Sequence, residues 1–414
     1  MNCIRSNPAL KALILSFVLL CSYRTIAGHH KPDNKKVHDR ARIISTYPEQ
    51  ITNPQKKNRK TFSQFGYNLY EFQVPILPVT KFIKLNKFGY QSYGKPDRST
   101  EKNGAIYTCR GGFIDMSHVR TAIDWTVYLC FKILSDTSDL DLPWEAGTLH
   151  LHFKNINSLT EDDIASMAQK IAFERLTWHE IASWHYHKPY HFLSEQGSTF
   201  TPEDTYSNFL GTVIGKSVAL RMLKDTATLS YSAVATEEIQ KMITSLKPLS
   251  KVKDSKRAYD MVDLNKQRKL PENERNHDVW YDSRIVFHDE RYVFKRYMNI
   301  GPELPPWLVP ESGQLGCPSN TRPDVLEVPQ RTHTGKSFYS YYEFTITPDT
   351  NMFYDHKRNR QTHPPFGSFT TEHYADVMVH INTQMTIPLG ANFDKRDSTD
   401  PTVNYTNVKK VFLK

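Results

Sequence analysis

Apolar residues recur every three or four positions between residues 115 and 134 (DMSHVRTAIDWTVYLCFKIL), including Val119, Ile123 and Val127. This spacing is that of one face of an α-helix. Asp115 stands just before the pattern, where its carboxylate can accept hydrogen bonds from the first backbone N–H groups. The sequence therefore predicts a helix that is capped by Asp115.

Two longer segments combine helical periodicity with start signals. Residues 160–187 open with Thr160, and Asp163 three positions later completes a near capping box. Residues 201–223 open with TPED, which supplies a cap residue, a proline at the first helical position and two acids in the first turn. Two shorter patterns predict helices over 237–246 and, after a cap at Thr371, over 372–385.

Alternating or β-branched and aromatic runs predict strands, which we place at residues 105–113, 147–156, 283–287, 292–298 and 337–347. We expect an α+β fold, with a helical core and flanking strands in the first half and an α+β second half.

The highly charged segment 251–278 marks the clearest change in composition. Few apolar residues interrupt its charges, which is typical of a linker or a surface loop. We expect it to separate a mainly helical domain at 63–250, carrying the candidate site, from an α+β region at 279–414.

The N-terminus has the pattern of a secretory signal peptide over residues 1–27. A basic start precedes the apolar run 12–20 (ALILSFVLL), which is too short to span a bilayer, since that takes about 20 residues. Thr25 and Ala27 place small residues three and one before a cleavage site after Ala27. A lipid anchor on Cys21 is the alternative, although Leu20 differs from the small residue that a lipoprotein signal prefers.

Residues 28–62 are polar and basic, which predicts a mobile leader. No later segment is long and apolar enough to span a membrane. We therefore expect an exported protein that is periplasmic, envelope-associated or secreted, with no transmembrane segment after cleavage.

The formal net charge of the chain is +9. The predicted signal peptide contains three basic residues and no acid, so +6 remains for the mature chain. No basic motif interleaved with aromatic residues indicates nucleic-acid readout, and we expect no nucleic-acid partner. Arg120 and Asp124, four positions apart on a helix, are expected to form a surface ion pair.

Five cysteines are present, and two of them lie in the predicted signal peptide. Cys109, Cys130 and Cys317 remain, so at most one disulfide can form within the mature chain. The sequence leaves the pairing open.

The sequence WHEIASWH places His179 and Glu180 together on an apolar helix. The pair partly resembles the zinc peptidase motif, in which two histidines four apart bind the metal and the adjacent glutamate acts as base. Ser183 stands where the second histidine would be, and His185 and His187 lie off that face. The segment therefore departs from the standard zinc peptidase motif at its second ligand, which argues against that class of enzyme.

Asp115 and His118 share a face at the start of their predicted helix, at a spacing that helical metal ligands use. Asp204, in the acid pair that opens a later helix, would face the same pocket. Each has a structural alternative: Asp115 as a cap, His118 as a hydrogen-bonded core histidine and Asp204 as a helix-start acid. Cys109 beside His118 would suit a nucleophile and base, but nothing indicates a lowered thiol pKa, which favours a structural cysteine.

Three blocks carry a resemblance to a known family: CRGGFIDMSHVRTAIDWTVYL, TWHEIASWHYH and FLSEQGSTFTPEDTYSNFLGT. They resemble an uncharacterised bacterial family, domain of unknown function 4056. The resemblance covers most of the mature chain and implies an exported or lipoprotein-like protein, but no activity and no catalytic residue. Family members carry a cysteine pair before Ala-Phe-Gly, whereas residues 61–66 here read TFSQFG, which argues against a family-wide thiol mechanism.

We therefore hypothesise a metal-assisted hydrolase acting outside the cytoplasm on a small molecule, peptide, glycan or lipid. His118, His179, Asp115 and Asp204 would bind zinc or another divalent metal. Glu180 would be the general base for a bound water, and we expect His118, His179 and Glu180 to converge on one pocket. The alternative is a non-enzymatic envelope or secreted protein, with a binding or structural role, in which these groups form a buried His, Glu and Trp network.

Overall fold

The computed structural model describes the chain in segments, namely residues 51, 53–54, 81–95, 97, 99–136, 138–144, 147–185, 202–224, 230–262, 286–288, 291–296, 315–318, 321, 324–348, 354–355, 360–361 and 368–374. The chain divides into two compact units, Met1–Arg42 and Ile43–Lys414, and every described residue belongs to the second. The predicted signal peptide, most of the leader and the predicted helix beyond residue 374 lie outside the described residues.

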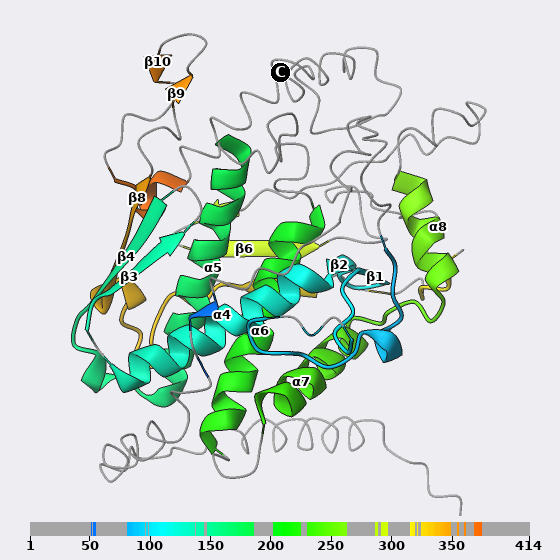
Figure 1. The fold of residues 1–414 in the computed structure, drawn as a ribbon, viewed down its shortest axis with the longest axis horizontal. Helices are drawn as coiled ribbons and strands as arrows, with labels where there is room; N and C mark the ends of the chain where they lie inside the picture. Colours follow the sequence, from blue (N-terminus) through cyan, green and yellow to red (C-terminus); the bar gives the residue numbers. More distant parts are fainter. Residues whose placement is uncertain are drawn as a thin grey trace, which may run out of the picture. The chain divides into compact units, whose positions relative to one another are not determined.

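Helices dominate the first half of the described chain (Figure 1). They are α4 (Met116–Ser135), α5 (Glu161–His185), α6 (Pro202–Lys224), α7 (Tyr231–Ser245) and α8 (Val252–Val262), with short 3-10 turns η2 (Leu85–Lys87), η3 (Ile156–Ser158), η7 (Phe338–Ser340) and η8 (Thr371–His373). None of the described helices has the length and apolar content needed to cross a membrane.

The described strands form small antiparallel sheets. They are β1 (Ala105–Thr108), β2 (Gly112–Asp115), β3 (Leu140–Trp144), β4 (Gly147–Phe153), β5 (Val286–His288), β6 (Arg291–Arg296), β7 (Asp324–Glu327), β8 (Tyr342–Pro348), β9 (Tyr354–Asp355) and β10 (Arg360–Gln361). β1 pairs with β2 and β9 with β10, while β3-β4-β8 and β5-β6-β7 are three-stranded. The α+β class with a helical first half is confirmed.

Two of the predicted helix caps are confirmed. The Asp115 carboxylate accepts a hydrogen bond from the Ser117 N–H at 2.7 Å. Thr160 and Asp163 form the reciprocal capping pair, with the Asp163 N–H donating to Thr160 Oγ1 at 3.1 Å and the Thr160 N–H to Asp163 Oδ2 at 3.2 Å. Helix α7 begins six residues earlier than predicted, because Ser230 caps it by accepting from the Ala233 N–H.

The charged segment 251–278 does not begin as a loop, because α8 occupies residues 252–262. Ser255, Ala258 and Tyr259 are buried and lie at i, i+3 and i+4, so one helix face packs while the charges stay on the other. At the C-terminal end, Thr370 rather than Thr371 is the cap of η8.

Two expectations about exposure are also wrong. Within the predicted leader, Ile51 and Pro54 are buried, so this part of the segment packs against the core. Arg120 and Asp124 are buried as well, and Gln91 joins them: the Arg120 guanidinium donates to Gln91 Oε1 at 2.8 Å, and Gln91 Nε2 donates to Asp124 Oδ1 at 3.1 Å. Residues 88–94 cover this face of α4, which turns the expected surface pair into a core network.

A disulfide joins Cys109 to Cys317, with their Cα atoms 5.5 Å apart. It ties the turn between β1 and β2 to the segment before β7. Cys130 is a free, buried cysteine. This settles the pairing that the sequence left open.

Helices α4 and α6 approach each other closely at two glycines of α6. A Cβ atom on Gly211 would lie 2.4 Å from the Val119 carbonyl oxygen and 2.6 Å from Ala122 Cβ. A Cβ atom on Gly215, one turn further, would lie 2.6 Å from Thr126 Cβ. Real Cβ contacts are not this short, so the two backbones can meet here only because both positions lack a side chain.

We predict that Gly211→Ala lowers the free energy of unfolding by about 1–2 kcal/mol. Alanine gains about 1 kcal/mol in helix propensity, but overpacking a rigid backbone contact costs about 1–3 kcal/mol. Chemical denaturation of the purified variant measures the difference. Lys224→Ala, at an exposed position of the same helix, is the control, and we expect it to stay within about 0.5 kcal/mol of the parent. Equal or greater stability of Gly211→Ala would contradict close backbone packing.

Candidate metal centre

The candidate site lies where the N-terminal turns of α4 and α6 meet. Strand β2 ends at Asp115, and the backbone N–H of Asp115 donates to Ser207 Oγ of α6 at 2.9 Å. This bond fixes the junction of β2 and α4 against the second turn of α6. His118 follows on the first turn of α4, and Asp204 lies on the first turn of α6.

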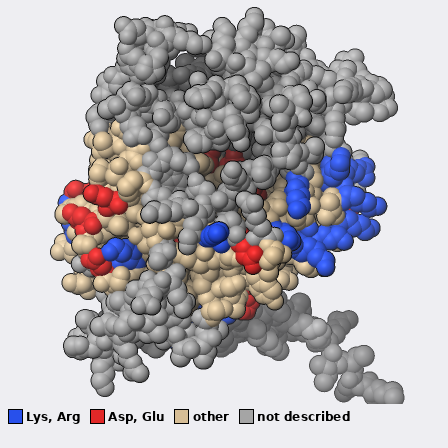
Figure 2. Space-filling view, in the orientation of Figure 1, with Lys and Arg blue, Asp and Glu red and all other residues tan. Residues whose placement is uncertain are grey.

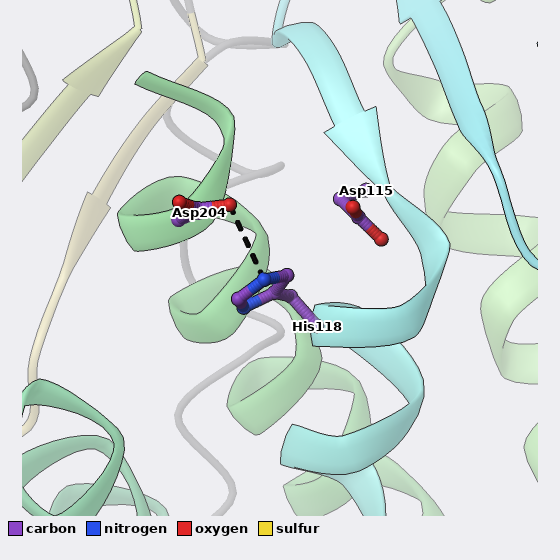
Figure 3. Close-up of side chains that lie close together, drawn as sticks. All are labelled: Asp115, His118 and Asp204. Carbon is purple, nitrogen blue, oxygen red and sulfur yellow. Dashed lines mark ion pairs between the residues drawn. The ribbon is translucent and has the colours of Figure 1, made fainter. Parts of the chain in front are cut away.

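Asp115, His118 and Asp204 form the group that could hold a metal ion among the described residues, with one ligand atom from each within 4.8 Å of the others. In the view of Figure 3, Asp204 and Asp115 lie on either side of the His118 ring. Asp115 is 3% exposed and Asp204 is 4% exposed. One ion bound at about 2.1 Å from each ligand needs ligand atoms no more than about 4.2 Å apart, so small side-chain rotations close the site.

The His118 ring makes a directed contact through each nitrogen. Nε2 lies 3.2 Å from Asp204 Oδ1, and Nδ1 lies 3.0 Å from Asn208 Oδ1. Asn208 is four residues after Asp204 and therefore on the same face of α6. Its amide nitrogen donates to Glu180 Oε1 of α5 at 3.2 Å.

This chain of contacts determines which ring nitrogen carries the proton. An ionised carboxylate only accepts hydrogen bonds, so Glu180 orients the Asn208 amide with its NH₂ group toward α5. The Asn208 oxygen then faces His118 and requires a proton on Nδ1. In the neutral ring, Nε2 consequently presents its lone pair to Asp204, an arrangement that suits a cation between the two groups or a second proton on the ring.

The surroundings favour ionised ligands. Asp115 is the N-cap of α4 and Asp204 lies in the first turn of α6, where the partial positive charge of each helix start stabilises a carboxylate. With a neutral ring, the three groups together carry two negative charges. A divalent cation would balance that charge.

A second buried carboxylate shows what a satisfied structural network looks like. Glu174 Oε1 accepts from Lys170 Nζ at 2.6 Å and from the Tyr339 hydroxyl at 2.9 Å, and Glu174 Oε2 accepts from the Tyr342 hydroxyl at 2.7 Å. Arg175, the neighbour in sequence, instead lies over the Trp125 ring. Lysine and tyrosine donors surround Glu174, whereas in the candidate site a histidine ring nitrogen faces the Asp204 carboxylate.

Thiol chemistry is not available at the site. Cys109, the nucleophile that could have used His118 as a base, is oxidised in the disulfide. Burial raises the pKa of the Cys130 thiol, which keeps it protonated and unreactive.

The structure brings together three of the four predicted metal ligands, Asp115, His118 and Asp204. The fourth, His179, is half-buried on α5 and does not belong to this group. Its role as a ligand stays a prediction. Glu180 reaches His118 through Asn208, which the sequence reasoning missed, although its position one turn after Asp204 could have suggested it.

These features define an α+β protein with a candidate metal centre between two closely packed helices. The chain belongs to the family described as protein of unknown function (DUF4056), whose profile matches residues 64–310. That range includes Asp115, His118, Glu180, Asp204 and Asn208. No curated protein and no solved structure matches the chain.

We predict that the neutral ring of His118 carries its proton on Nδ1 in the metal-free protein. Long-range ¹H–¹⁵N correlation spectra of ¹⁵N-histidine-labelled protein distinguish the tautomers. Asn208→Ala removes the acceptor and should allow both tautomers. A neutral ring with its proton on Nε2 in the parent protein would contradict the directed chain from Glu180.

Proposed function

We propose that Asp115, His118 and Asp204 bind one divalent cation and that the protein is a metal-assisted hydrolase. The observation that carries the proposal is the orientation of His118, whose Nε2 lone pair faces a carboxylate within the three-residue group. Histidine ligands of metals commonly donate their other ring N–H to a protein acceptor. Asn208, oriented by Glu180, supplies such an acceptor.

The donor set indicates the class of metal. One imidazole and two carboxylates form a mixed N/O site that suits zinc, manganese or iron(II). Three protein ligands are typical of catalytic zinc sites, which keep a position for water or substrate. A cation bound there would lower the pKa of a coordinated water and so supply the nucleophile for hydrolysis.

The surrounding residues would position the ligands. Ser207 holds the backbone at Asp115, and Asn208 holds the His118 ring. Glu180 accepts a hydrogen bond from Asn208, which contacts Nδ1 of the ring, and this supports a positioning role for Glu180. Its role as general base remains the alternative.

We also propose that the protein is exported after cleavage following Ala27 and acts on an extracytoplasmic peptide, glycan, lipid or small molecule. The signal-like N-terminus supports export. The Cys109–Cys317 disulfide supports it independently, because disulfides persist mainly in oxidising compartments.

Export of the protein can be tested separately from metal binding. We expect chain recovered from outside the cytoplasm of the producing cell to begin at Gly28, as measured by N-terminal sequencing. Retention of the full-length chain in the cytoplasm would overturn export. Lipid attached to Cys21 would replace a soluble exported form with an anchored one.

Metal binding is tested on the mature chain after treatment with chelator and reloading with Zn²⁺ or Mn²⁺. We expect about one equivalent bound and a raised melting temperature, since a ligand at 100 times its Kd stabilises the folded state by about 2.7 kcal/mol. Asp204→Asn keeps the side-chain shape and removes the charge, so it should abolish both effects in a folded protein. Asn208→Ala should weaken binding about 10- to 100-fold.

Asp97→Asn is the matched control, because Asp97 is an exposed carboxylate outside the group. If the parent binds no metal and Asp204→Asn lowers its melting temperature, the site is a structural network and the proposal fails. Hydrolysis of a panel of ester, peptide and glycan substrates then tests activity in the loaded protein. Glu180→Gln retains an acceptor for Asn208, so activity should survive it if Glu180 only positions Asn208 and should be lost if Glu180 is the base.

A further inference from the structure

A dense group of basic side chains lies at one side of the described molecule, where Figure 1 draws α8, and Figure 2 shows it as the largest blue area of that face. We call it the α8 basic patch. Its exposed members are Lys81, Lys84, Lys87, Lys247, Lys251, Lys253, Lys256 and Arg257.

Three of the eight members of the patch lie on one face of α8. Lys253, Lys256 and Arg257 lie at i, i+3 and i+4 and are exposed. Ala258 and Tyr259 are buried on the other face. Among the side chains of α8 that the structure describes, Ala258 and Tyr259 pack on the protein, whereas the Lys and Arg side chains face the solvent.

Lys247 and Lys251 lie just before α8, and the other three members, Lys81, Lys84 and Lys87, come from a segment far away in the sequence. The Phe82 ring contacts the Tyr259 ring, with centroids 5.6 Å apart, and so joins this segment to α8. The Lys81 carbonyl accepts from the Ala105 N–H at 2.8 Å, which fixes the same segment to the β1 strand. Two stretches far apart in sequence thus form one surface.

The charge of the patch is large compared with that of the chain. Residues 81–88 and 247–257 contain eight basic side chains and one acid, Asp254, so they carry +7. The whole chain carries +9, of which three charges lie in the predicted signal peptide. The patch therefore carries more positive charge than the +6 surplus of the mature chain, and the rest of the mature chain carries a net charge of −1.

We propose that the α8 basic patch docks the protein on an anionic membrane surface, by contact with the phosphate groups of lipid head groups. Each Lys or Arg near such a surface strengthens binding roughly fivefold, so eight of them suffice for attachment without insertion. Within the two segments, Phe82 packs against Tyr259 and Phe88 is buried, and Tyr90 is the exposed aromatic residue nearest to them in sequence, so the described patch lacks the series of aromatic rings on which successive bases of a single strand stack. The patch shares no residue with the candidate metal centre.

The test uses the mature chain and sedimentation with vesicles, either of phosphatidylcholine alone or with about one third phosphatidylglycerol, at about 0.1 M salt. We expect binding to the anionic vesicles only, weakening as salt rises, because screening shortens the reach of the charges. Lys253→Glu with Lys256→Glu should weaken it by about 30-fold or more.

Lys224→Glu with Lys336→Glu is the matched control, because it makes the same change in net charge at exposed lysines outside the patch. We expect it to weaken binding less than threefold. Equal loss in both double variants, or equal binding to neutral vesicles, would overturn the proposal. Tighter binding to a short RNA or DNA through Lys253 and Lys256 would overturn it in favour of a nucleic-acid surface.

Discussion

The close approach of α4 and α6 is the constraint on which the candidate site depends. Gly211 and Gly215 let the helix backbones meet, and this contact fixes both the separation and the rotation of α6. One and two turns earlier, the same face of α6 presents polar residues to the junction of β2 and α4. These are Asp204, Ser207 and Asn208. A rotation of α6 by one residue, about 100°, would remove all three from His118 and Asp115.

The hydrogen bonds of the candidate site form one chain, in which each side chain orients the next, and this chain starts on α5. Glu180 orients Asn208, Asn208 orients His118, and the ring then presents an acceptor to Asp204. Each step follows from the donor and acceptor chemistry of one side chain. Because the carboxylates stand at helix starts, the backbone itself favours their charged form. The geometry of the site is therefore set by secondary structure and packing rather than by a loop.

Local signals in the sequence predicted much of this fold. Caps such as Asp115 and the Thr160–Asp163 pair form between residues within one helical turn. They can therefore be predicted from residues that are close together in the sequence. The features that the sequence did not predict depend on which helix and loop surfaces pack against each other in the fold. Arg120 was expected at the surface because nothing local shows that Gln91 covers it. Helix α8 was not predicted because its buried positions are three small or aromatic residues among many charged ones. Three such positions give only a weak helical periodicity.

The candidate site, too, could be predicted only in part from the sequence. Asp115, His118 and Asp204 could be nominated because each stands at a helix start with a chemically suitable side chain. Asn208 could be found only once Asp204 was known to face α4, because an asparagine in a helix has many ordinary roles. His179 looked equally suitable in the sequence, yet the group that forms does not include it.

The disulfide makes the helical region a covalent ring. Cys109 and Cys317 are 208 positions apart, so β2, α4, α5, α6 and the candidate site all lie within the closed loop. A ring of this size removes conformational freedom from the unfolded chain, by on the order of 5 kcal/mol in the chain-entropy account. A single backbone cut inside the ring would leave one covalently continuous molecule. The fragments produced by a cut between the site-bearing helices would thus stay joined as long as the disulfide is intact.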